Sequence, residues 1–407
     1  MLAACLLTDQ SCQLDNVPRI TDVETMVEML RGLGAEVGWI SQSSVQVRAA
    51  GPISTEVSGQ LAARMRASFL LLGPLLGRCG RAVIPRPGGD DIGMRRVEQH
   101  IIGLRSMGAS IDQMGSAYRA RAETGLTGAK VILDMPTVTG TENLLMAAVL
   151  ARGRTVIVNA AREPHVQDLA RFLNRLGAQI KGAGSDTITV AGVEKLGGGR
   201  HRVVTDYIEA GTYAIAAVAT GGDVLIRDCR PRDLVALTMK LERVGASCQV
   251  GRNWLRVRAS GVVRAVDLTT WPHPGFATDL QAPYLTLMTQ ARGSSMVSEA
   301  VFENRFRHVP ELIRMGARIT QEGRSALIDG PCHLQGGSVV APDIRSGAAL
   351  VVAALCASGY TEVHRIDHLD RGYQDLVGKL RGLGADIRRL GSARDDLPKA
   401  PPSHVYE

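Results

Sequence analysis

The sequence is poor in aromatic residues and lacks a metal-binding cysteine pattern, and both absences exclude classes of protein. Phe, Trp and Tyr make up 4% of the 407 residues. With no long basic run and no stacking-aromatic motif, we expect no nucleic-acid partner. The seven cysteines include no CxxC pair and no zinc spacing, so we expect no metal site and a reducing, cytoplasmic setting. No apolar run reaches the length of a membrane span, so we expect no membrane partner.

What is present is ordinary for a soluble globular protein. Hydrophobic residues make up 45% and charged residues 21% of the chain, and its length suffices for two or three domains. The net charge of +7 suits anionic ligands, although simple solubility explains it equally well. No P-loop, GxGxxG or GxSxG stands in a supporting context, and we expect no cofactor.

One short segment recurs six times along the chain. Its last copy is Leu380-Arg-Gly-Leu-Gly-Ala-Asp-Ile387, and the glycines of the six copies lie 68 to 74 residues apart, at Gly34, Gly108, Gly177, Gly245, Gly316 and Gly384. Each copy is typical of the last turn of a helix, a glycine stop that tolerates positive φ, and the start of a strand. The repeats therefore predict six versions of one α/β unit.

The first unit shows the pattern within each repeat. Thr21-Asp-Val-Glu24 has the form of a capping box, and one helical face then carries Val23, Met26, Val27, Leu30 and Leu33. Val45 and Val47 alternate as in a strand. Helices with one apolar stripe between short strands predict sheets covered by helices.

Three units per domain place a boundary near residues 203–206. We expect a first lobe at residues 1–203, a second at 204–391 and a disordered tail at 392–407, whose charges and prolines do not favour a packed core. Two similar lobes facing each other across a cleft would form a usual place for a ligand.

The repeat count also predicts that N-terminal strands are missing. The residues before Gly34 and after Gly384 together supply roughly 40 residues of a unit that takes about 70 elsewhere. Met1 begins inside an apolar helical run. We therefore expect close to 30 residues more in a complete version, and an unpaired sheet edge in the second lobe without them.

Residues 87–96, Pro87-Gly-Gly-Asp-Asp-Ile-Gly-Met-Arg-Arg96, form the most unusual loop. Three glycines allow a mobile backbone, so this loop is a candidate lid that carries an acid and anion-binding guanidinium groups onto a substrate. A solvated turn with surface ion pairs is the alternative. Arg66, Arg345 and Arg371 are further candidates that taken singly also fit surface ion pairs, and Asp279 also fits a helix cap.

Several segments together resemble the UDP-N-acetylglucosamine 1-carboxyvinyltransferase family of enolpyruvyl transferases. They run in family order along nearly the whole chain, and the segment at 302–316 is the most specific. The segments are Met65-Arg-Ala-Ser68, Pro87-Gly-Gly-Asp-Asp-Ile-Gly93, Thr141-Glu-Asn143, Asn159-Ala-Ala-Arg-Glu-Pro164, Ile208-Glu-Ala-Gly-Thr212, Thr278-Asp279, Phe302-Glu-Asn-Arg-Phe306, His308-Val-Pro-Glu-Leu312 and Asp370-Arg-Gly-Tyr373. The resemblance implies an α/β fold of two inside-out α/β barrel domains, each with three repeats.

The resemblance also implies a reaction, the first step of peptidoglycan synthesis. The enolpyruvyl group of phosphoenolpyruvate moves to the 3-hydroxyl of UDP-N-acetylglucosamine by addition and elimination, and phosphate leaves. Arginine forks suit the phosphate and carboxylate of phosphoenolpyruvate. By resemblance, Arg95 and Arg371 face the phosphate, Arg345 the carboxylate, and Arg66 lies near the reacting groups.

Further roles follow from the same resemblance. Asp279 takes the 3-hydroxyl proton, and closure over two anions would raise its pKa toward that of a useful base. Asp90, Asp279 and Arg371 are thus the expected catalytic residues. The nucleotide sugar is expected at Arg95, Arg96, Val97, Glu98, Gln99, Met135, Pro136, Thr137, Val138 and Val301.

Two departures from the family pattern bear on activity. The lid position that is usually cysteine is Asp90, an acid that can donate a proton if closure raises its pKa from about 3.9. Because a carboxylate attacks an epoxide less readily than a thiolate, we expect insensitivity to fosfomycin. The family's Lys-Asn pair, which contacts phosphoenolpyruvate, is expected just before Met1, and its loss would slow the reaction by two or more decades.

Two alternatives stay open at this point. A sister transferase would act on another acceptor, although residues 159–164 and 302–312 speak against shikimate 3-phosphate and leave a nucleoside hydroxyl. A non-catalytic paralogue would bind the nucleotide sugar or a partner without turnover.

Overall fold

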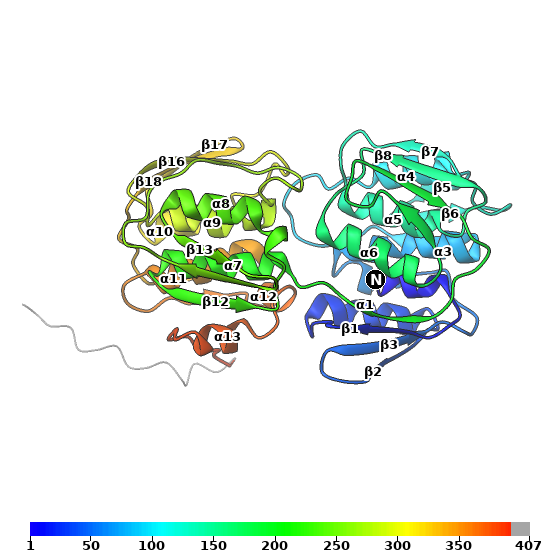
Figure 1. The fold of residues 1–407 in the computed structure, drawn as a ribbon, viewed down its shortest axis with the longest axis horizontal. Coiled ribbons are helices and arrows are strands. Elements are labelled where there is room, and N and C mark those ends of the chain that lie inside the picture. Colours follow the sequence, from blue (N-terminus) through cyan, green and yellow to red (C-terminus); the bar gives the residue numbers. More distant parts are fainter. Residues whose placement is uncertain (392–407) are drawn as a thin grey trace, which may run out of the picture.

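The structure, a computed structural model, describes residues 1–391, and the predicted tail at 392–407 lies outside the described residues. Two lobes lie side by side, with helices in the middle of each and sheets around them (Figure 1). Within residues 1–391, no helix combines the length and apolarity needed to cross a membrane.

The first lobe contains eleven strands in three sheets. Its elements are η1 (Ala3–Leu7), β1 (Cys12–Asp15), α1 (Thr21–Gly32), β2 (Glu36–Trp39), β3 (Ser44–Arg48), α2 (Gly59–Ala62), η2 (Arg66–Leu71), α3 (Leu72–Cys79), β4 (Arg81–Pro85), α4 (Glu98–Ser106), β5 (Ser110–Met114), β6 (Ala117–Arg121), β7 (Lys130–Ile132), α5 (Val138–Ala148), β8 (Arg154–Val158), α6 (Pro164–Arg175), β9 (Gln179–Lys181), β10 (Thr187–Ala191) and β11 (Gly199–Arg202). The sheet orders are β11-β1-β3-β2, β4-β6-β5 and β7-β8-β10-β9.

The second lobe repeats this plan. Its elements are α7 (Tyr207–Ala219), β12 (Asp223–Arg227), η3 (Pro231–Asp233), α8 (Val235–Val244), β13 (Ser247–Val250), β14 (Trp254–Arg258), β15 (Leu268–Thr269), η4 (Thr278–Leu280), α9 (Gln281–Met288), β16 (Gly293–Ser298), α10 (Val309–Arg314), β17 (Ile319–Glu322), β18 (Ser325–Gly330), β19 (Ser338–Val340), α11 (Ile344–Cys356), β20 (Glu362–His364), α12 (Asp367–Asp370) and α13 (Leu376–Gly382). The described sheets are β12-β14-β13, β15-β16-β18-β17 and the parallel pair β19-β20.

Buried helices form the centre of each lobe. In the second lobe α7, α9 and α11 contact one another, and in the first lobe α3 contacts both η1 and α5. These helices are apolar nearly all round, which is typical of helices enclosed on every side. Sheets and amphipathic helices such as α6 surround them, as an inside-out α/β barrel requires. The predicted fold class is confirmed.

The six repeat glycines end six outer helices. Their φ angles lie between 92° and 111° at Gly34, Gly108, Gly177, Gly245, Gly316 and Gly384, a region that L side chains rarely adopt. At Gly34 a Cβ would also lie 2.8 Å from the Pro52 carbonyl oxygen. Five of the six glycines are followed by a hairpin.

Two local predictions are wrong. No strand follows Gly384 within residues 385–391, where no ladder partner holds the backbone. The capping box also does not form, because α1 begins at Thr21 with Ile20 as its N-cap and no side-chain cap. The Glu24 carboxylate is held instead by Arg19 (2.8 Å) and by the Trp39 indole N–H (3.3 Å). The predicted apolar face of α1 is nevertheless buried, except for half-buried Val23.

Residues 203–206 connect the two lobes. One apolar core extends from Ala3 to Leu196, and the cores of the second lobe begin at Ile208. The Val203 N–H donates to the Asp15 carbonyl (2.9 Å), and Asp206 caps α7 through the Ile208 N–H (2.8 Å). We propose that the domain boundary lies here, at residues 203 and 204.

Candidate active site

The lid at residues 87–96 is held tightly against its own lobe. A Cβ at Gly88 would lie 1.8 Å from the Ala63 carbonyl oxygen, so only glycine fits there. Gly89 and Gly93 have φ angles of 104° and 126°. The glycines thus let the backbone follow a path that other residues would block.

The lid also contacts the second lobe. The Met94 N–H donates to Glu303 Oε1 (2.5 Å), the Asn304 N–H donates to the Ile92 carbonyl (3.1 Å), and Arg307 Nη1 donates to the Asp91 carbonyl (3.1 Å). These bonds join residues more than two hundred positions apart in sequence. The loop therefore bridges the lobes and is not a free solvated turn.

Asp90 points from the lid to Arg371, which is its ion-pair partner (2.6 Å). Arg371 also makes a two-pronged contact with Asp22, from Nε (2.9 Å) and Nη2 (3.2 Å). Burial raises the pKa of Asp22 above its usual range, in spite of this partner. For Arg371, burial lowers the pKa, but the bonds to Asp22 and the charges of Asp22 and Asp90 together outweigh burial, and the pKa is raised.

Asp279 lies in η4 between two arginines. It pairs with Arg305 and with Arg345 Nε (3.2 Å). Burial alone would raise its pKa, but the charges of Arg345 and then Arg305 outweigh burial and hold the pKa far below its usual value. Two guanidinium groups thus stabilise the carboxylate, and the rise in pKa expected on closure over two anions stays a prediction for the substrate-bound site.

Two further arginines of the first lobe extend this group. Arg66 donates to the carbonyl of Arg95, and burial and then the charge of Arg95 lower the pKa of Arg66 to about 10. Burial, followed by the charge of Arg305, also lowers the pKa of Arg95. The Arg95 and Arg305 guanidinium carbons lie 5.9 and 5.3 Å from the centre of the Phe302 ring. Phe302 therefore provides a π surface that both cations approach.

Some guanidinium donors of this group are free although buried. Arg305 Nε and Arg345 Nη1 have no hydrogen-bond partner among the described residues. Because buried donors left unpaired cost free energy, such atoms fit a site that receives an acceptor from a ligand. Planar guanidinium forks suit phosphate and carboxylate oxygens best. The residues described include no group of three or more His, Cys, Asp or Glu placed to hold a metal ion.

The residues expected at the nucleotide sugar form a neighbouring pair of segments. Gln99 Nε2 donates to Asp134 Oδ2 (2.9 Å), and the Asp134 N–H donates back to Gln99 Oε1 (3.1 Å). This pair joins the predicted stretches 95–99 and 135–138. Thr137 caps α5 through the Gly140 N–H.

The other expected sugar residues differ in exposure. Met135 is exposed, and Pro136 and Val138 are half-buried; Val97 is buried; Glu98 is exposed, and exposed Arg96 lies beside the Met94 sulfur. The Val301 N–H donates to Glu299 Oε1 (2.8 Å). The roles of these residues stay predictions.

Three site residues were missed from the sequence. Arg305 lies inside the most specific family segment, so this segment offered a signal for it. Asp22, in the first turn of α1, had the appearance of a helix-start carboxylate. Glu299 is buried and accepts from Thr270 and Thr278 (2.8 and 2.9 Å), which fixes the turn before Asp279, and no sequence pattern indicated it.

Arginines and carboxylates from both lobes thus meet under one loop, an arrangement that defines an anion-handling transferase site. The family model for EPSP synthase (3-phosphoshikimate 1-carboxyvinyltransferase) matches residues 1–380, and the chain belongs to this family of enolpyruvyl transferases.

Individual relatives are similar to this chain over most of its length. The chain is 49% identical over 390 residues to UDP-N-acetylglucosamine 1-carboxyvinyltransferase of Solibacter usitatus, covering 96% of this chain and 93% of the relative. It is 48% identical over 390 residues to the protein of the same name from Idiomarina loihiensis, with the same coverage of both chains.

Among solved structures, the enolpyruvyl transferase NikO from Streptomyces tendae superposes with a TM-score of 0.86 at 27% identity, over 95% of this chain and 92% of that one. EPSP synthase from Acinetobacter baumannii superposes with a TM-score of 0.71 at 17% identity, over 94% and 93% of the chains, a likeness that concerns the fold.

Proposed function

We propose that this protein transfers the enolpyruvyl group of phosphoenolpyruvate to the 3-hydroxyl of UDP-N-acetylglucosamine in the cytoplasm, the first step of peptidoglycan synthesis. The observation that carries the proposal is the group of buried and half-buried arginines that share one site with Asp90 and Asp279. The free buried donors of Arg305 and Arg345 support a small ligand with several anionic oxygens. The names of relatives that are nearly half identical support the acceptor.

In this proposal, Asp279 accepts the proton of the 3-hydroxyl while the sugar oxygen bonds to C2 of phosphoenolpyruvate. A proton goes to C3, and Asp90 on the lid is the acid placed to supply it. The tetrahedral adduct then returns a proton from C3 to the Asp90 carboxylate, the C2–O bond to phosphate breaks, and phosphate leaves.

The ion pairs of the site fit these roles. Asp279 is ionised at neutral pH because Arg345 and Arg305 hold its pKa low. An incoming anion that shares those guanidinium groups raises this pKa and makes the carboxylate a stronger base. Arg371 would exchange its contact with Asp90 for one with substrate phosphate, which releases the Asp90 carboxylate so that it can carry a proton.

The test is a phosphate-release assay with the purified protein. We expect release only when phosphoenolpyruvate and UDP-N-acetylglucosamine are both present, and none when shikimate 3-phosphate or uridine replaces the nucleotide sugar. Arg345→Gln should lower kcat/KM about a hundredfold or more. Arg314→Gln, at an exposed pair in α10, is the matched control and should stay near wild type.

Other outcomes would overturn the proposal in defined ways. Release with uridine would indicate a nucleoside acceptor. Binding of UDP-N-acetylglucosamine by calorimetry without any phosphate release would favour the non-catalytic paralogue.

A further inference from the structure

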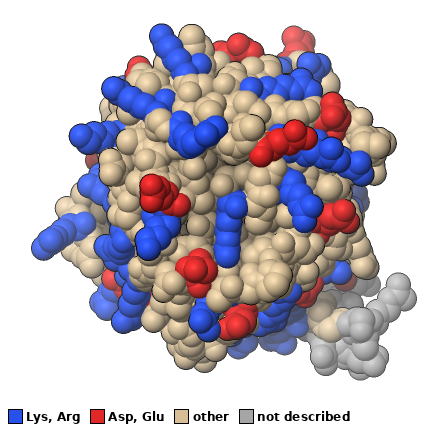
Figure 2. All heavy atoms as spheres, turned by 90° about the vertical axis from the view of Figure 1, so that its right-hand side faces the viewer, with Lys and Arg blue, Asp and Glu red and all other residues tan. Residues whose placement is uncertain are grey.

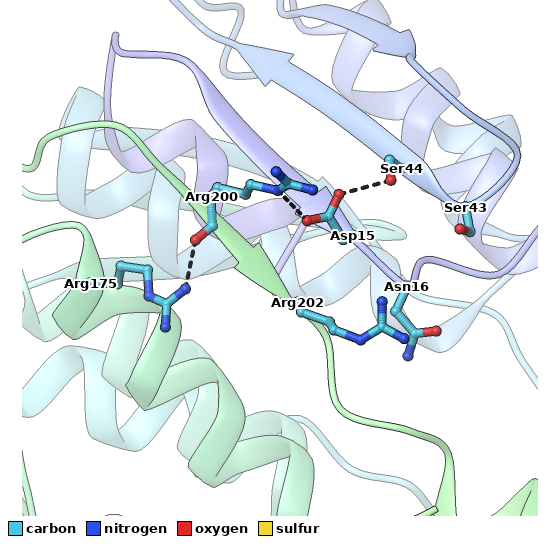
Figure 3. A pocket seen from close by; sticks show the side chains of 7 residues that line it. All are labelled: Asp15, Asn16, Ser43, Ser44, Arg175, Arg200 and Arg202. Atoms are coloured by element: carbon cyan, nitrogen blue, oxygen red, sulfur yellow. Dashed lines mark hydrogen bonds and ion pairs between the residues drawn. The ribbon is translucent and has the colours of Figure 1, made fainter. Parts of the chain in front are cut away.

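A basic pocket lies in the first lobe, where β1, β3 and β11 meet the end of α6. Its volume is about 390 Å³, and its lining consists of Asp15, Asn16, Ser43, Ser44, Arg175, Arg200 and Arg202. None of these residues belongs to the candidate active site. Figure 3 shows Arg200 on β11 reaching the carboxylate of Asp15, Arg175 at the end of α6 directed at the Arg200 carbonyl, and the Arg202 guanidinium beside Asn16.

The single acid of the pocket is already neutralised. Asp15 accepts from Arg200 Nε (2.5 Å), the Ser44 hydroxyl (2.8 Å) and Gln13 Nε2 (3.0 Å). These bonds, with that from Arg200 first, hold the pKa of Asp15 at about 2. Asp15 is therefore a fixed anchor that orients Arg200, and three arginines against one carboxylate leave a net charge of +2.

Most donors of the three arginines remain available. Arg175 uses Nη1 to donate to the Arg200 carbonyl (2.8 Å), and Arg200 uses Nε on Asp15. Within residues 1–391, the guanidinium of Arg202 has neither a hydrogen-bond nor an ion-pair partner. Lys and Arg are spread over the outer face of this lobe with Asp and Glu among them (Figure 2), so charge alone marks no site. The site is marked instead by three arginines that line the same pocket.

The same residues hold the connection between the lobes. Asn16, which has a φ of 60°, donates from its side-chain amide to the Val203 carbonyl (3.0 Å). Buried His201, between Arg200 and Arg202 on β11, lies 3.2 Å from Asp168, and Asp168 accepts from the Val204 N–H (2.9 Å). A ligand bound to the arginines of β11 therefore contacts the strand that continues directly into residues 203–206, the segment that leads to α7.

We propose that this pocket is a second anion site, specific for the diphosphate group of a phosphorylated small molecule, and that its occupancy changes how readily the lobes close. Guanidinium forks bind phosphate oxygens bidentately. Three of them around about 390 Å³ suit two linked phosphates better than one carboxylate. The diphosphate can come from free pyrophosphate or from a nucleoside diphosphate.

Calorimetric titration with inorganic pyrophosphate and with UDP tests binding. The Arg345→Gln background weakens anion binding near Asp279 but keeps the residues expected to hold the nucleotide sugar, so pyrophosphate should still bind saturably and UDP should bind at two sites. Adding Arg175→Gln and Arg202→Gln should weaken pyrophosphate binding at least tenfold and remove one of the two UDP sites, while adding Arg252→Gln, an exposed loop arginine, should do neither. Circular dichroism checks that each variant is folded.

The two probes identify the source of the ligand. Equal affinity for pyrophosphate and UDP means that the diphosphate carries recognition, and tighter UDP binding means a nucleoside diphosphate. Both results support the site if the pocket variant loses them. The absence of saturable pyrophosphate binding in the Arg345→Gln background, or equal pyrophosphate binding after the pocket substitutions, overturns it.

Coupling to the lobes has its own readout. Without the Arg345 substitution, pyrophosphate should change KM or kcat of the wild-type enzyme in a way that Arg175→Gln with Arg202→Gln abolishes. An identical effect of pyrophosphate on both proteins would show competition at the active site and would refute coupling. Binding is measured without turnover, so an inactive protein would leave the binding test intact.

Discussion

Replacing Arg305 by methionine removes one of the two cations that hold Asp279 ionised. Arg305 is buried and pairs with Asp279, while Arg345 remains 3.2 Å away from the same carboxylate. Two unit charges about 4 Å apart interact by ~4 kcal/mol at an effective dielectric constant of 20. The Asp279 side chain is 33% exposed, so solvent screening reduces this value.

We therefore expect the pKa of Asp279 to rise by about one to two units, at 1.36 kcal/mol per unit. If Asp279 is the base, the acid limb of the profile of kcat against pH moves to higher pH by the same amount. The free energy of unfolding at neutral pH falls as the pKa of Asp279 in the folded protein rises. A lowered folded pKa stabilises the protein fully above the unfolded pKa of about 3.9, and this contribution is lost only as the pH falls through the folded pKa.

The assay is phosphate release across pH, with urea unfolding at pH 7 and pH 3. Arg305→Met should lose stability at pH 7, by about 3 kcal/mol at most because Arg345 still pairs with Asp279, and by a similar amount at pH 3, because Asp279 of the folded wild type is still ionised there. Arg314→Met should shift neither measurement. An unmoved acid limb together with unchanged stability at pH 7 would refute the assignment of Arg305 as an electrostatic partner of Asp279.

Three other predictions follow from the lid and the basic pocket. Preincubation with excess fosfomycin should leave phosphate release unchanged, whereas Asp90→Cys should become sensitive because a thiolate opens the epoxide; inactivation of the wild type would contradict this. Glu303→Ala removes the acceptor of the Met94 N–H. We therefore expect kcat/KM to fall about tenfold and protease to cleave residues 87–96 faster. Unchanged cleavage would mean that this bond does not hold the lid. Asp15→Asn should destabilise the protein at pH 7 but not near pH 2, since the pKa of Asp15 is about 2 when Arg200 holds it; equal destabilisation at both values would argue against this ion pair.

Much of the fold could be read from the sequence because its signals are local. The repeat glycines all have positive φ, and few other residues tolerate that conformation. A single glycine therefore predicted where each outer helix ends. Apolar positions of the predicted first stripe, such as Met26, Val27 and Leu30, are buried as expected. The capping box failed because a tertiary contact, from Trp39 and Arg19, competed for Glu24.

The site was predictable only in part. Residue types and the family resemblance indicated Arg95, Arg345, Arg371, Asp90 and Asp279, but each taken singly also fitted a surface ion pair. No local pattern indicates that Arg371 meets Asp22, about 350 positions earlier in the sequence, or that Glu299 fixes the turn before Asp279.

The sequence by itself determined the sixfold repeat, the outer helices that end at its glycines and the kind of chemistry that arginines and carboxylates provide, and the family resemblance implied the inside-out arrangement. Backbone conformation at glycine and the periodicity of apolar residues act within a few residues and need no partner elsewhere. Only the tertiary structure decided which charges share a site and in which direction the pKa of Asp279 moves. Coulombic interaction depends on distances in space, and folding sets those distances between residues far apart in the chain.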